Sequence, residues 1–150
     1  MLRIGTEKYF ASLAQFEKHL PTGKDEELLI LKGHLLIERL LTRFVDANVP
    51  RPERIPLDLR FAVKLAIASS LCKDASSDWL WEAIAALNRL RNELAHQLAP
   101  PKFAHLRKGF VALVERSPEL PHLEPPSNIL DRLHRAIFSV HEGLSYRVDL

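Results

Sequence analysis

Apolar side chains recur every three or four residues along most of this chain, and no segment shows the strict alternation of a half-buried β-strand. With 150 residues and 47% hydrophobic content, the chain can bury one core, so we expect a single domain over residues 1–150. The fold class is therefore an all-α bundle of five to six helices. The helices are predicted over residues 7–20, 25–46, 58–72, 76–98, 102–115 and 128–144. Ser76 or Ser77 is the predicted cap of the fourth of these helices.

The segment 25–46 predicts the longest helix of the chain. Three acidic residues, Asp25 to Glu27, suit the positively polarised end where a helix begins. Apolar side chains cover most of its circumference, and Glu38 interrupts this surface. Such a helix is either the central member of a bundle or is shared with a second subunit.

Composition limits the partners and the location of the protein. The 21 Lys and Arg residues nearly balance 19 Asp and Glu, so the charge neither demands nor excludes nucleic acid. The single cysteine, Cys72, excludes an internal disulfide or a Cys-rich zinc site. No apolar run reaches the ~20 residues that a membrane span needs, and the segment 1–6 lacks the apolar stretch of an export signal. We therefore expect a cytoplasmic protein with no membrane partner.

Arg91 stands out in the segment 76–98. At about 100° per residue it falls inside an apolar stripe formed by Leu80, Ile84, Leu87, Leu94 and Leu98. A buried guanidinium without a partner is costly, so Arg91 should meet a carboxylate, a carbonyl, a water-filled cleft or an anionic ligand. An ion pair with Glu38 would be purely structural, whereas an anionic ligand would make the position functional. The sequence leaves both interpretations open.

His96 follows Arg91 after five positions, so the two side chains diverge by about 140° on one straight helix. They reach one cleft if their long side chains or a frayed helix end bring them together, or if a second copy of the helix across a two-fold axis supplies one of them. Asn92 is four residues before His96 and can hold its ring in one tautomer.

The segment 87–96 (LNRLRNELAH) resembles the signature helix of the HEPN superfamily (higher eukaryotes and prokaryotes nucleotide-binding). The motif of this superfamily is an arginine, four to six residues and a histidine, commonly with asparagine directly after the arginine; Arg91, Asn92 and His96 match it. The segments 33–41 (GHLLIERLL) and 59–66 (LRFAVKLA) are similar to the second and third helices of the mannitol operon repressor family and related HEPN-like proteins. Together the resemblance covers about residues 28–98.

The resemblance implies a metal-independent endoribonuclease that needs no cofactor and works as a homodimer whose two motif helices line one cleft. His96 would be the general acid and base, Arg91 would stabilise the charge that develops on phosphorus, and Asn92 would orient the site. Further basic residues would bind neighbouring RNA phosphates, and the candidates are Arg89, Lys102, Arg107 and Lys108.

The similarity to the mannitol operon repressor implies an alternative, a non-catalytic helical regulator that binds a protein partner. In that case Arg91 pairs with Glu38, and His96 is a solvated surface residue. A guanidinium that opens into a cleft with His96 would favour the nuclease instead. His34 and Glu38 share one helical face, but two ligands do not make a metal site.

Overall fold

The computed structural model describes residues 7–19, 25–96, 100–119 and 124–148, and every regular element within these ranges is helical. The predicted all-α class is therefore confirmed. Two short 3₁₀ turns, η1 (Pro52–Arg54) and η2 (Ala75–Ser77), precede the third and fourth helices. In chain order the helices are α1 (Glu7–His19), α2 (Glu26–Asn48), α3 (Phe61–Leu71), α4 (Asp78–His96), α5 (Pro100–Glu115) and α6 (Ile129–Val148).

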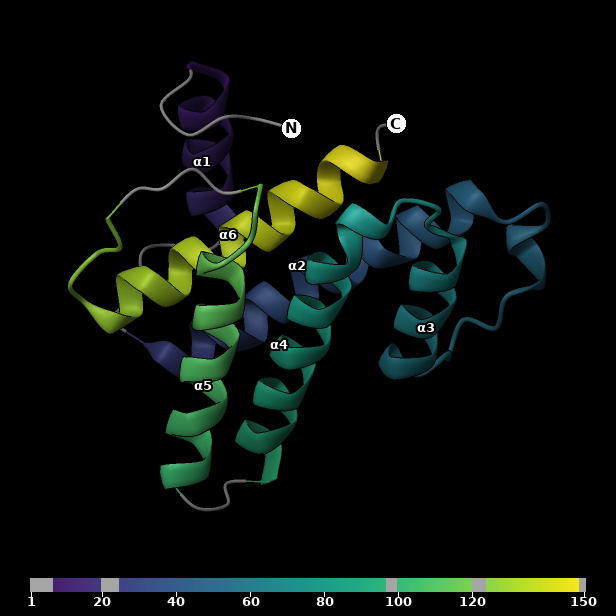
Figure 1. Cartoon of the computed structure of the whole chain (residues 1–150). Coiled ribbons are helices and arrows are strands. Elements are labelled where there is room, and N and C mark those ends of the chain that lie inside the picture. Colours follow the sequence, from purple (N-terminus) through teal and green to yellow (C-terminus); the bar gives the residue numbers. More distant parts are fainter. Residues whose placement is uncertain (1–6, 20–24, 97–99, 120–123, 149–150) are drawn as a thin grey trace.

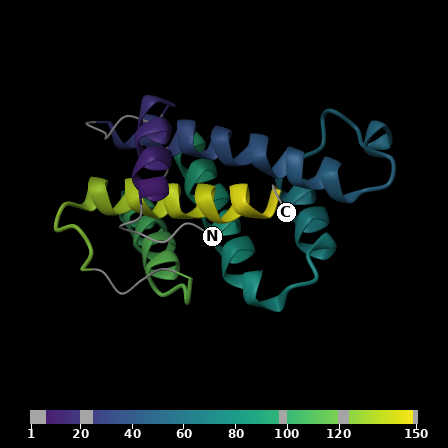
Figure 2. The same ribbon diagram turned by 90° about the horizontal axis from the view of Figure 1, so that it is seen from above.

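The helices α2 and α6 lie side by side in the middle of the molecule and run in the same direction (Figure 1, Figure 2). They approach closely at Gly33, where an added Cβ would lie 2.7 Å from Cγ2 of the fully buried Ile137. The absent side chain at this position therefore allows the contact. On the other side of α6, Phe16 of α1 packs edge-on against Phe138, with 5.2 Å between the ring centroids.

The helices α4 and α5 form an antiparallel pair that packs against α2 and α6 at one end and extends past them at the other (Figure 1). Leu80, Ile84 and Leu87 of α4 are fully buried, as is Phe110 of α5. The final turns of α4 are largely exposed. The third helix, α3, contacts α2 and α4 on the side away from α5 (Figure 1).

Several helix boundaries differ from the predicted ones. α5 begins at Pro100 instead of residue 102, because the first turn of a helix tolerates a residue without an N–H group. α3 begins only at Phe61, after a turn at residues 57–58, and α6 continues four residues beyond the predicted end.

Ser77, one of the two predicted caps of the fourth helix, directly precedes the first residue of α4. Asp74 caps η2 by accepting a hydrogen bond from the Ser76 backbone. The Ser77 hydroxyl accepts a hydrogen bond from Arg147. None of the described helices is both long and apolar enough to cross a membrane.

Candidate functional site

Arg91 lies on the surface of α4, so the prediction that it is buried is wrong. Leu87, one turn earlier on the same stripe, is fully buried. The C-terminal half of α4 extends past α2 (Figure 1), and the residues buried along it are Leu90 and Glu93, on another side of the helix from Arg91. Within the described part of the chain, the guanidinium donates one long hydrogen bond, 3.5 Å, to the side-chain oxygen of Asn92.

The predicted ion pair between Arg91 and Glu38 is also wrong. Glu38 pairs with Lys64 of α3 instead, at 3.6 Å. Arg91 has no carboxylate partner among the residues that the structure describes. Its charge is therefore not neutralised by a carboxylate where α2 packs against α4. An ion pair with Glu38 therefore does not explain the position of this arginine.

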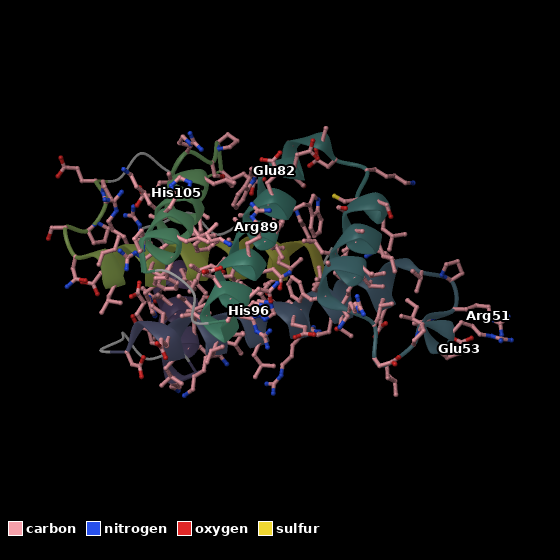
Figure 3. The ribbon with its side chains drawn as sticks, turned by 90° about the horizontal axis from the view of Figure 1, so that it is seen from below. Arg51, Glu53, Glu82, Arg89, His96 and His105 are labelled. Atoms are coloured by element: carbon pink, nitrogen blue, oxygen red, sulfur yellow. The ribbon has the colours of Figure 1, made fainter. Side chains whose placement is uncertain are left out.

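Asn92 and His96 are exposed as well, and His96 is the last residue of α4. Together with Arg89 they follow one line along the helix, because residues three, four and seven apart share a face. Arg91 lies on a different face, about 140° from His96, so the straight helix of one subunit keeps these two side chains apart. Figure 3 shows Arg89 and His105 on the side of the α4–α5 pair that faces away from α2.

The basic residues predicted to contact RNA do not all face the same way. Arg107 is half-buried and pairs with Glu26 of α2 at 2.7 Å, so its charge is already neutralised. Lys102 reaches Glu93 at 3.3 Å and remains 60% exposed. Lys108 and Arg89 are exposed. Three of the four candidates therefore keep contact with solvent, and Arg107 instead links α5 to α2.

His34 forms a buried polar link beside Arg91. Its side chain is 6% exposed, and Nε2 lies 3.0 Å from Oδ1 of Asn88 on α4. The ring of Phe61 from α3 packs against the imidazole at 4.3 Å between centroids. Burial lowers the pKa of His34 below its usual 6.5, and the hydrogen bond to Asn88 opposes this. The charge of Arg91 lowers the pKa further, and the charge of Glu38 raises it.

The neutral state of His34 makes the stability of the protein depend on pH. Because folding lowers its pKa, the unfolded chain, with the usual value of 6.5, binds more protons than the folded chain. The stability that the uncharged His34 contributes to the folded chain is complete above pH 6.5. It is lost as the pH falls through the pKa of His34 in the folded chain. In urea unfolding at pH 7.5 and pH 5.5, we expect wild type to lose more stability on acidification than His34→Gln.

The exposed His105→Gln serves as the control and should keep the pH dependence of wild type. An equal loss of stability on acidification in wild type and His34→Gln would contradict the assignment of this dependence to His34.

Two features of the surface and core escaped the sequence analysis. Glu93 is buried at 6% exposure, and its Oε1 has no hydrogen-bond partner among the described residues. The second feature is a set of three leucines of α2 that face solvent at 45–47% exposure: Leu28, Leu31 and Leu35. Their spacing of three and four residues was visible in the sequence, but apolar residues cover so much of the circumference of this helix that no single face could be chosen as the exposed one.

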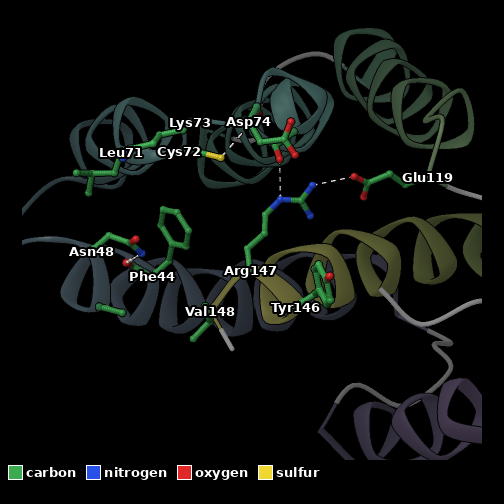
Figure 4. A pocket seen from close by; sticks show the side chains of 12 residues that line it. Phe44, Asn48, Leu71, Cys72, Lys73, Asp74, Glu119, Tyr146, Arg147 and Val148 are labelled. Atoms are coloured by element: carbon green, nitrogen blue, oxygen red, sulfur yellow. Dashed lines mark hydrogen bonds and ion pairs between the residues drawn. The ribbon is translucent and has the colours of Figure 1, made fainter. Parts of the chain in front are cut away.

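A hollow of about 580 Å³ lies between the C-terminal ends of α2, α3 and α6 (Figure 4). At its edge Arg147 donates hydrogen bonds to Ser77, to the carbonyl of Gly143 and to Glu119. Each nitrogen of the buried guanidinium thus donates a hydrogen bond to a protein group, and the hollow lies at the opposite end of α4 from His96. No group of three or more His, Cys, Asp or Glu side chains in the described ranges could hold a metal ion.

Comparison of the chain with family models, with curated proteins and with solved structures found no match. The fold defines an all-α helical protein.

Proposed function

We propose that the protein is a dimeric, metal-independent endoribonuclease whose site consists of Arg91, Asn92 and His96. One observation carries the proposal. All three side chains are exposed on the half of α4 that extends past α2, and Arg91 has no carboxylate partner in the described part of the chain. A guanidinium in this state favours an anionic ligand, and a phosphodiester is an anion on which the imidazole of a second subunit can act.

The chemistry needs only groups that RNA and these residues supply. The 2′-hydroxyl attacks the adjacent phosphorus, and the bond from phosphorus to the 5′-oxygen breaks. One imidazole of His96 accepts the proton of the 2′-hydroxyl, and an imidazole in its protonated form gives a proton to the leaving 5′-oxygen. Arg91 stabilises the extra negative charge on the phosphoryl oxygens. The products are a 2′,3′-cyclic phosphate and a free 5′-hydroxyl.

A second subunit completes this site. Within one helix Arg91 and His96 point about 140° apart, so convergence on one phosphate requires a copy from the partner. The exposed leucines of α2 supply a surface for it, because Leu31 lies one turn before His34, where α2 contacts α4. A two-fold axis beside this apolar stripe would bury the leucines of both subunits and bring the two α4 helices together.

The same leucines favour one alternative, a non-catalytic module of the mannitol operon repressor type. There the stripe of Leu28, Leu31 and Leu35 binds another protein, and Arg91 and His96 perform no chemistry. The two functions differ in what the purified chain does to RNA.

The test is an assay of purified wild type on total RNA with EDTA present, together with light scattering to measure mass in solution. We expect cleavage that leaves 2′,3′-cyclic phosphate ends, from a species with twice the mass of the chain. Intact RNA after long incubation with a well-folded dimer would contradict the nuclease and favour the interaction module.

A further inference from the structure

His34 of α2 contacts α4 one helical turn before Arg91. The imidazole contacts Asn88, and Arg91 follows Asn88 by three residues, which places it one helical turn further along α4. The ring of Phe61 from α3 packs against the imidazole. Arg91 is therefore an exposed cation close to a buried, uncharged base.

The groups that act on the imidazole come from three helices. α2 contributes Glu38, which is held by Lys64 of α3, and α4 contributes Asn88 and Arg91. The Asn88 oxygen accepts from Nε2, so Nδ1 is the ring nitrogen that can take up a second proton. The carboxylate of Glu38 is already neutralised by Lys64, whereas the charge of Arg91 is open to an anion from solution.

We infer that Arg91 and His34 form a proton-linked phosphate site, in which a phosphate group bound by Arg91 draws a proton from solvent onto Nδ1 of His34. The anion offsets the positive charge that opposes protonation of the ring. By thermodynamic reciprocity, protonation of His34 must then strengthen the binding of the anion. This inference rests on the proposed function only in taking Arg91 as the phosphate-binding residue, and it does not require cleavage.

The test follows the titration of the histidine rings by NMR, without an anion and with two probes that keep a constant charge across the range. The first probe is inorganic sulfate, which stands for free phosphate. The second is an oligodeoxythymidylate, whose phosphodiesters stand for a nucleic-acid backbone and which cannot be cleaved because it lacks 2′-hydroxyls. We expect bound anion to raise the pKa of His34 by roughly half a pH unit, the effect of a unit charge at a distance of about 10 Å in a mixed dielectric.

The two probes separate the sources of the phosphate group. A shift with the oligonucleotide supports a backbone site, and a shift with sulfate alone supports a site for a free anion. The absence of a shift with either probe would overturn the inference.

Two matched variants locate the effect. Arg91→Gln should raise the pKa of His34 without any anion and abolish the response to both probes. Arg54→Gln removes an exposed arginine of η1, outside the proposed site, and should leave both unchanged. An identical anion response in wild type and Arg91→Gln would also refute the inference.

The outcome is independent of the nuclease assay. A protein that does not cleave RNA but shows the His34 shift retains the phosphate site and loses the proposed activity. A protein that cleaves RNA without the shift retains the activity and loses the linkage.

Discussion

Replacing His96 by alanine is expected to lower the rate of the proposed RNA cleavage by about 10²–10⁴-fold, the usual contribution of a general acid or base. Because the imidazole would both accept the proton of the 2′-hydroxyl and supply one to the leaving oxygen, no other group in the proposed site replaces it. The side chain is exposed at the end of α4, so its removal should change the free energy of unfolding by less than about 1 kcal/mol. Initial rates on a labelled RNA oligonucleotide with EDTA measure the effect.

His105→Ala is the matched control, because His105 is also an exposed histidine of the α4–α5 pair (Figure 3). It should cleave RNA at the rate of wild type, and both variants should unfold at the same urea concentration as wild type. Equal rates in wild type and His96→Ala would remove His96 from the chemistry.

The helical architecture could be predicted from the sequence because it depends on local signals. Apolar spacing located all six helices, and Asp25 begins α2 as expected, with its carboxylate accepting a hydrogen bond from the backbone of Leu28 at 3.2 Å. The close approach at Gly33 could not be predicted, because it depends on which residue of α6 lies opposite.

The position of Arg91 shows where a helical projection stops being informative. The projection gives the angle of a side chain around the axis, but not which side of the helix its neighbours cover; in the last turns of α4 the buried residues are Leu90 and Glu93. Arg91 has nearly the angle of the buried Leu87 and lies only about 6 Å further along α4, yet it is exposed. The sequence therefore identified the residue for a reason that the structure overturns, and its functional interpretation now rests on exposure instead of burial.

The predicted basic patch illustrates a second limit. Arg107 and Lys102 were grouped with Lys108 because they are close in sequence, but their partners come from other helices. Arg107 pairs with Glu26, which precedes it by 81 positions, and Lys102 pairs with the buried Glu93. Sequence proximity alone cannot show which charges are already neutralised by such long-range contacts.

Leu31→Glu is expected to raise the dissociation constant of the dimer at least about 100-fold, and RNA cleavage should be lost with the dimer. Leu31 is 45% exposed in the single chain, so a glutamate is solvated there and the subunit should still fold. In the proposed dimer the same carboxylate would be buried against an apolar surface, and the two-fold axis would place a second one nearby. Sedimentation across a range of protein concentrations measures the dissociation constant.

Leu57→Glu provides the control for an added charge, because Leu57 is fully exposed outside the stripe of α2. It should leave both the dimer and the cleavage rate unchanged. Monomeric Leu31→Glu protein that cleaves RNA at the wild-type rate would show that one subunit is sufficient, which the 140° separation of Arg91 and His96 on a straight helix does not allow. A dimer that persists in this variant would place the interface elsewhere. Loss of the dimer together with loss of cleavage would instead connect the apolar face of α2 to the chemistry on α4.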